Sequence, residues 1–153
     1  MKLRVLTVGK SRCGWAQEAV TDYDKRLRRW GGVVEESVKA QTFRGDVDAV
    51  RLAESERLIA RLAPNERLVA LDERGENLST EAFARLVELC RDDATPLAFA
   101  LGGAYGHDAI LRQRAWRVIR LSSLVLNHEV ARVVLYEQLY RSLDWLEGGP
   151  YHH

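Results

Sequence analysis

Apolar residues along this chain follow two spacings that alternate from one end to the other. Short runs of adjacent or alternating apolar residues predict strands at 2–8, 33–38, 67–71, 96–101 and 116–121. Apolar residues three or four apart predict helices between them, at 15–30, 46–62, 79–91, 108–114 and 128–146. Regular alternation of strand and helix predicts an α/β fold, with a mostly parallel sheet covered by helices on both faces.

The segment 96–101 is expected to be the central strand, since Leu97 to Leu101 is a continuous apolar run that Gly102 and Gly103 end. Ser79 is a suitable cap for the helix 79–91, with Glu81 near the positive end of its dipole. The chain shows no repeat, linker or low-complexity run. Its 153 residues therefore predict one domain, spanning 1–153.

The last predicted helix is apolar on nearly every side. At 100° per residue, its apolar positions point all round the helix axis: Val130, Val133, Val134, Leu135, Leu139, Leu143, Trp145 and Leu146. A helix of this kind must be buried on every side. We therefore expect it to pack on its own sheet and also on a second subunit, as in a homodimer.

Composition adds limits to this fold. Hydrophobic residues make up 46% and charged residues 29%, the balance of an ordinary globular protein. No apolar run is long enough for a membrane span or a signal peptide, so a cytoplasmic protein without a membrane partner is expected. Cys13 and Cys90 are expected to be free thiols. The four histidines lack companion ligands, and no metal is expected.

Charge is distributed unevenly along a chain whose net charge is +1. Residues 1–30 contain eight Lys or Arg against three acidic residues. This basic third is suited to contact a phosphate backbone. A solvated face of the first helix explains it equally well.

Ligands of open α/β sheets bind beyond the carboxyl ends of the strands. Three segments occupy such positions: 71–75, 101–106 and 121–127. The GGxxG run in the second is as compatible with a plain turn as with a ligand loop. GxGxxG, GxxxxGK[ST] and GxSxG are all absent, so dinucleotide, P-loop and hydrolase sites are disfavoured.

Polar residues collect on the last helix and the tail. His128 and Arg132 are four residues apart, as are Glu137 and Arg141, so each pair shares a face. Two intrahelical pairs are the simplest interpretation. Charged groups on an otherwise buried helix nevertheless need partners or a use, which favours a functional role.

A set of motifs covering essentially the whole chain resembles the ribosomal RNA large subunit methyltransferase H family. The most specific combination is Glu137-Gln138-Leu139-Tyr140-Arg141 followed by Pro150-Tyr151-His152 at the terminus. Matching runs elsewhere are Val8–Lys10, Tyr23–Leu27, Leu71-Asp72 with Gly75, Leu78–Glu81, Phe99–Gly103 with Gly106, and Ser122 with Asn127–Glu129 and Arg132. His153 departs from the family, which often has Lys or Arg there.

The resemblance implies a SPOUT (alpha/beta knot) methyltransferase fold, in which the C-terminal segment threads a trefoil knot. It implies a homodimer that uses S-adenosylmethionine to methylate N3 of a pseudouridine, at position 1915 of 23S rRNA, on assembled 70S ribosomes, with no DNA partner. Carried over by position, the cofactor site comprises Leu71, Gly103, Ser122, Ser123, Leu124, Val125, Leu126 and Asn127. The substrate site comprises His128, Glu137, Arg141, Tyr151 and His152, with the tail reaching the other subunit's cofactor.

The chemistry of this reaction suggests roles for the substrate-site residues. The N3 imide proton must leave, and either His128 or His152 is placed to take it. Arg141 would stabilise the developing anion, Glu137 would hold Arg141, and Tyr151 would stack on the base. Three alternatives remain: a SPOUT enzyme acting on another RNA such as tRNA, a non-catalytic ribosome-binding module, and a nucleotide-binding regulator or oxidoreductase.

Overall fold

The structure is a computed structural model that describes all 153 residues. Five parallel strands form one sheet in the order β2-β1-β4-β3-β5. They are β1 (Leu3–Val8), β2 (Val33–Val38), β3 (Arg67–Asn77), β4 (Leu97–Leu101) and β5 (Arg117–Arg120). The helices are α1 (Gly14–Leu27), which continues as a 3-10 turn (Arg28–Trp30), then α2 (Val47–Ile59), α3 (Thr80–Asp92), α4 (Ala109–Arg114) and α5 (His128–Leu146).

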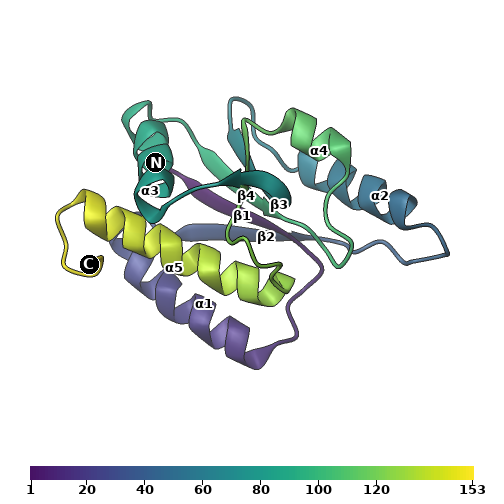
Figure 1. The fold of residues 1–153 in the computed structure, drawn as a ribbon, viewed down its shortest axis with the longest axis horizontal. Helices are drawn as coiled ribbons and strands as arrows, with labels where there is room; N and C mark the ends of the chain where they lie inside the picture. The colour runs from purple at the N-terminus through teal and green to yellow at the C-terminus, as the bar shows by residue number, and fades with distance from the viewer.

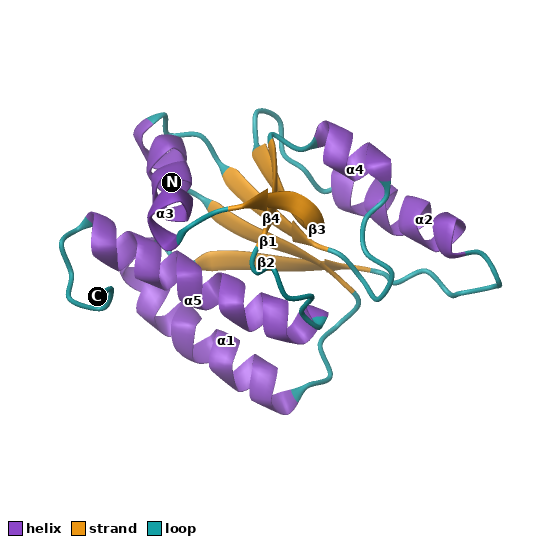
Figure 2. Ribbon diagram, in the orientation of Figure 1, coloured by secondary structure: helices purple, strands orange, loops and turns teal.

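Helices cover both faces of the sheet, as the alternation of elements predicts. Helices α1, α3 and α5 lie together on one face, and α2 and α4 cover the other (Figures 1 and 2). The central strand β4 is fully buried, with Phe99 packed in the core under α3 and α5 and Ala98 and Ala100 in the core under α2 and α4. Its continuous apolar run thus serves two cores at once.

Most element boundaries follow local sequence signals. Strand β2 and helix α5 occupy the predicted ranges, and α5 begins where the side chain of Asn127 accepts a hydrogen bond from the Glu129 amide. Gly148, at φ +73°, follows the end of α5, in the left-handed conformation that favours glycine. The oxygen of Ser79 accepts from the Ala82 amide and caps α3, as expected.

Strand β3 differs from its predicted length, because it continues six residues past Leu71 to Asn77. Its pairing with β5 is interrupted by a register shift, so that Leu71 and Glu76 both lie opposite Ile119. At Gly75 the two backbones come so close that an added Cβ would lie 2.5 Å from the Ile119 carbonyl carbon. The polar run after Leu71 indicated a loop. That prediction is corrected, because β3 continues through this run and pairs with β5.

Helix α5 is not buried on every side within the single chain. Leu135, Leu139 and Leu143 are fully buried, whereas Val130 is 37% exposed and Val133 and Val134 are half-buried. Within the single chain, α5 therefore packs on its own sheet and on neighbouring helices, and part of its apolar surface stays exposed. No helix here combines the length and the apolar run that a bilayer crossing requires.

Candidate functional site

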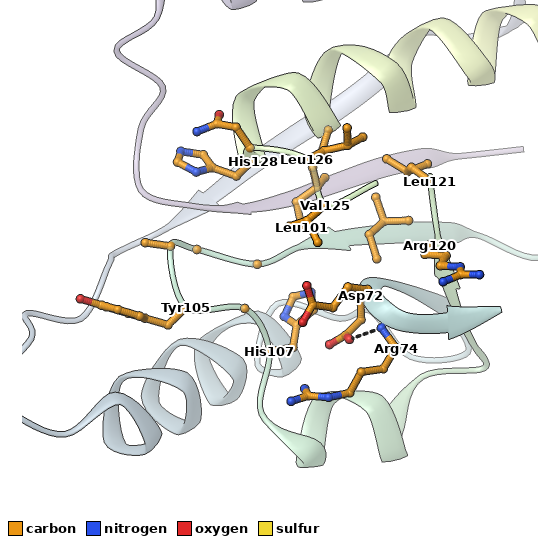
Figure 3. Close-up of a pocket in the computed structure, with 18 of the residues that line it drawn as sticks. Asp72, Arg74, Leu101, Tyr105, His107, Arg120, Leu121, Val125, Leu126 and His128 are labelled. Carbon is orange, nitrogen blue, oxygen red and sulfur yellow. Dashed lines mark hydrogen bonds between the residues drawn. The ribbon is translucent and has the colours of Figure 1, made fainter. Parts of the chain in front are cut away.

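A cavity of about 580 Å³ opens beyond the carboxyl ends of β4 and β5 and beside the middle of β3, at residues 71–74. Pockets for small organic ligands typically have volumes of roughly 300–1,000 Å³. Its walls come from the three predicted strand-end segments and from the start of α5. Figure 3 shows Leu101, Leu121, Val125 and Leu126 facing one another, with His107, Asp72 and Arg74 on the opposite side. The three segments that the sequence indicated as a ligand site therefore line one cavity.

Most of the residues predicted to bind cofactor line this cavity. They are Leu71, Gly103, Ser122, Leu124, Val125, Leu126 and Asn127. Ser123 is exposed and is not among the lining residues. Leu124 and Val125 are 76% and 79% exposed, so the segment 121–127 lies open to solvent at the cavity mouth. The Ser122 oxygen accepts from the Leu124 amide and shapes this turn.

Some charged groups in the cavity wall have hydrogen-bond or ion-pair partners and others do not. Asp72 accepts a hydrogen bond from the Arg74 amide at 2.9 Å, drawn in Figure 3, and pairs with Arg112 at 3.2 Å. Arg120, at the far side of the cavity from Tyr105, has a buried Nε with no hydrogen-bond partner. A buried donor without a partner is costly unless a ligand satisfies it. Arg120 therefore offers a site for an anionic or carbonyl group.

His107 lines the cavity and was not singled out from the sequence. It is 3% exposed, and its Nε2 lies 3.2 Å from the Ala100 carbonyl oxygen. Burial lowers the pKa of His107, which favours the neutral imidazole at neutral pH. Its contacts hold the loop after β4 against the strand ends, and a lone histidine in a run of glycines gave no signal for this role.

The five residues predicted to act on substrate fall into two groups. His128 lines the cavity at the beginning of α5, while Glu137 and Arg141 lie further along the same helix. A helix rises 1.5 Å per residue, so the thirteen residues from His128 to Arg141 span about 20 Å. Within one chain, these two groups cannot act on the same atom of a substrate.

The second group is a compact cluster built by the returning C-terminal tail, which turns back beside α5 in Figure 1. Arg141 donates to Glu137 through Nε at 2.9 Å, and its guanidinium carbon lies 4.6 Å from the Tyr151 ring centroid. Its Nη1 also lies 3.4 Å from Nδ1 of His152. The hydrogen bond with Glu137 raises the pKa of Arg141, so it stays charged. Four of the predicted residues are thus brought together.

Buried groups fix the tail in this position. Asp144, 3% exposed, accepts from the Tyr151 amide at 3.1 Å. The Tyr151 ring meets Tyr140 edge-on at 4.8 Å, and its hydroxyl lies 3.2 Å from that of Tyr23. This hydrogen bond, followed by burial, raises the pKa of Tyr151. On the other side, His152 Nε2 lies 3.2 Å from Glu81.

The expected pair between His128 and Arg132 does not form. Arg132 is buried and binds Glu35 on β2, donating through Nε at 2.9 Å and through Nη2 at 2.7 Å. Tyr136 donates to the same carboxylate at 2.8 Å. His128 instead lies 3.6 Å from Glu129. The prediction of an intrahelical pair was wrong because a carboxylate on the neighbouring strand offers Arg132 two hydrogen bonds.

The fold and the cavity define the class of protein: a parallel α/β chain with a cavity of small-ligand size at its strand ends and a separate polar cluster further along α5. Residues 1–152 match the family described as predicted SPOUT methyltransferases. Relatives named ribosomal RNA large subunit methyltransferase H include those of Geobacter sulfurreducens, 44% identical over 155 aligned residues and 100% of both chains, and Trichlorobacter lovleyi, 40% identical over 154 and 100% of both.

Solved structures agree with the fold. A probable methyltransferase from Bordetella pertussis superposes with a TM-score of 0.60 at 17% identity, covering 93% of this chain and 94% of that one. A probable methylase family protein from Haemophilus influenzae gives 0.59 at 10% identity, covering 99% and 70%. The chain belongs to the SPOUT methyltransferase family, among the proteins of the ribosomal RNA large subunit methyltransferase H type.

Proposed function

We propose that this protein transfers a methyl group from S-adenosylmethionine to N3 of a pseudouridine in large-subunit ribosomal RNA, acting on assembled 70S ribosomes. Full-length similarity to relatives named for that RNA is the observation that carries the substrate class. The pseudouridine, its N3 atom, position 1915 of 23S rRNA and the assembled ribosome follow from the resemblance of the Glu137–Arg141 and Pro150–His152 motifs.

The cavity fits the proposed cofactor in size and chemistry. Leu71, Leu101, Leu121 and Leu126 supply apolar walls for an adenosine, and the glycine loop at Gly103 supplies backbone amides. Arg120 lines the cavity and makes no ion pair, and its guanidinium would pair with the carboxylate of the methionine moiety. When bound, the cofactor supplies a methyl group on a sulfonium, an activated leaving group.

The Arg141 cluster would act on the base. The imide nitrogen must lose its proton to form the bond to carbon as the carbon–sulfur bond breaks. Arg141, held by Glu137, would stabilise the negative charge on the imide, and Tyr151 would stack on the base. His152 in the cluster and His128 at the cavity are both retained as candidate proton acceptors.

We further propose a homodimer in which the tail of one subunit completes the cavity of its partner. The distance of about 20 Å along α5 supports this arrangement, since one chain cannot bring Arg141 to its own cavity. The exposed Val130, Leu124 and Val125 beside the cavity are apolar surface of the kind that a second subunit covers. The trefoil knot stays a prediction from the family resemblance.

The reaction is tested with radiolabelled S-adenosylmethionine and, separately, 70S ribosomes lacking the modification, free 23S rRNA and bulk tRNA. Label on 70S ribosomes alone, mapped to 3-methylpseudouridine, is the expected result. Label on tRNA instead would favour the alternative SPOUT enzyme. Ribosome co-sedimentation without methyl transfer to any RNA would favour the binding module.

The dimer is tested by light scattering at micromolar concentration. The 17.4 kDa chain should scatter with twice its own mass. Complementation provides a sharper measurement: Arg141→Ala mixed with a cavity variant such as Gly103→Trp should regain activity that neither has alone, because one of the two composite sites in a mixed dimer is intact. A monomeric mass, or no recovery after subunit exchange, would overturn the composite site.

Replacing Arg120 with methionine should weaken binding of S-adenosylmethionine about tenfold or more, since a hydrogen bond to a charged group contributes about 1.5–3 kcal/mol. Isothermal titration calorimetry measures the change. Binding of 5′-methylthioadenosine, which lacks the carboxylate, should be equal in the two proteins. Equal weakening of both ligands would show that Arg120 shapes the cavity without pairing with the carboxylate.

A further inference from the structure

Two exposed aromatic rings meet at the rim of the cavity. Phe43 is 50% exposed and Tyr105 is 38% exposed, and their ring centroids are 5.7 Å apart at an interplanar angle of 36°. Phe43 comes from the segment 39–46 after β2, and Tyr105 comes from the glycine loop after β4. In Figure 3, Tyr105 points outward from the edge of the cavity. The pair thus presents apolar ring surface to solvent beside the proposed reaction site.

Both rings sit on backbone that is tied to α2. Arg51 donates to the Tyr105 carbonyl at 2.7 Å. Arg57 donates to the Lys39 carbonyl at 2.8 Å, and the Gln41 amide donates to the buried carboxylate of Glu54 at 3.0 Å. The rings are therefore part of a platform whose position is fixed before any partner binds, which limits the entropy lost on binding.

Unpaired positive charge gathers at the same edge of the sheet. Of the 23 Lys and Arg residues, 12 make no ion pair. Half of these lie on this side of the sheet, either at or just beyond the carboxyl ends of strands (Lys10, Arg12, Lys39, Arg44 and Arg120) or in the cavity wall (Arg74). Among the carboxylates there, Asp48 pairs with Arg51 and Asp72 with Arg112, whereas Asp46, Glu54, Glu73 and Asp108 make no ion pair. The six unpaired cations outnumber these four carboxylates, so this side of the sheet has a small excess of positive charge.

The part of the basic first third that lies along α1 does not supply a comparable surface. Along the C-terminal half of α1 and the turn after it, Arg26 pairs with Asp22, Arg28 with Asp24, and Arg29 with Asp144 and Glu147. These cations are already neutralised by neighbouring carboxylates. Of the two surfaces, the rim around Phe43 and Tyr105 is the one with charge left for a polyanion.

We infer that Phe43 and Tyr105, with Arg44 beside them, bind single-stranded RNA next to the nucleotide that enters the cavity. An exposed ring stacks on an unpaired base, a contact that every base can make, and the adjacent guanidinium contacts a phosphate. This inference rests on the proposed function, since it requires an RNA substrate at this cavity. It assigns to the rim the nucleotides that flank the methylated base.

The test separates stacking from simple apolar contact at Phe43, which lies outside the cavity lining. Phe43→Leu keeps an apolar side chain and loses the ring, whereas Phe43→Trp keeps a ring. Binding of a fluorescein-labelled single-stranded RNA of about ten nucleotides, a length within the range of such sites, is followed by anisotropy. Phe43→Leu should weaken binding fivefold or more, and Phe43→Trp should stay within about twofold of the original protein.

Arg44→Ala should weaken RNA binding and lower the slope of log affinity against log salt by about 0.7, the loss of one phosphate contact. Matched controls are Leu89→Ala, an apolar side chain 48% exposed on α3, and Arg61→Ala, an unpaired cation at the opposite edge of the sheet. Both should bind RNA as the original protein does. Cofactor binding by the Phe43 and Arg44 variants should also be unchanged.

Equal RNA affinity for Phe43→Leu and the original protein would overturn the inference. So would a rise in KM for ribosomes without a change in RNA affinity, because the rim would then contact a ribosomal protein. Failure of the original protein to methylate any ribosomal RNA would overturn the proposed function itself. The anisotropy measurement needs no turnover, so the two failures are distinguishable.

Discussion

Replacing Arg141 with alanine should lower the rate of methyl transfer to 70S ribosomes by about 10²–10³-fold, the usual loss when a donor to a developing anion is removed. Arg141 is the only cation that hydrogen-bonds both the tail and Glu137. Single-turnover transfer of labelled methyl groups measures the effect. Binding of S-adenosylmethionine, which we propose occurs in the cavity at the other end of α5, should be unchanged.

Two further variants make this prediction specific. Arg141→Lys keeps the charge but loses the planar guanidinium that bonds Glu137, so it should recover only a small part of the rate. Arg114→Ala removes an exposed arginine at the end of α4, on the opposite face of the sheet from α5, and it should leave the rate unaltered. If Arg141→Ala retained the rate to within a factor of two, the assignment of Arg141 to the developing anion would be wrong.

Gly75→Ala should lower the free energy of unfolding by about 3 kcal/mol or more, or prevent folding. The added methyl group would lie 2.5–2.6 Å from three backbone atoms of Ile119, and backbone atoms in a strand cannot move aside as a flexible side chain does. A loss of this size is a large part of the roughly 5–15 kcal/mol that stabilises a domain. Urea unfolding followed by circular dichroism measures it.

Gly14→Ala is the matched control, because Gly14 begins α1 and a Cβ there would meet nothing within 4 Å. Alanine in a helix is favoured over glycine by about 0.5–1 kcal/mol, so this variant should be as stable as the original protein or more so. Equal stability of Gly75→Ala and Gly14→Ala would mean that β3 and β5 do not approach as closely in solution as described.

The sequence predicted those parts of the fold that depend on local signals. The apolar run of β4, the Ser79 cap and the start of α5 at His128 each depend on neighbouring residues, and the structure confirms all three. The extension of β3 was missed because Asp72 to Gly75 has the composition of a turn. Its pairing with β5 comes from a segment about forty residues later.

Parts of the site that depend on tertiary contacts were beyond sequence reasoning. The Glu35–Arg132 pair joins residues 97 positions apart, and the buried Arg4–Glu66 pair joins residues 62 apart. No periodicity relates such residues. The separation of His128 from the Arg141 cluster was different in kind, since the rise of a helix already implied it. This separation bears on the site only because the cavity lies at one end of α5.

The position of β4 between β1 and β3 has a consequence for the synthesis of this protein. Leu3 pairs with Leu97, 94 residues later, and no two neighbouring strands of the sheet are joined by a hairpin. At about 5–20 residues per second, β1 waits roughly 5–20 s for its partner on the translating ribosome. Meanwhile β1 and β3 both present open hydrogen-bonding edges, which are templates for aggregation. Folding of this protein should therefore depend on chaperones that hold nascent chains. Slowing elongation before residue 97 lengthens the wait, and it should reduce the soluble yield when such chaperones are depleted.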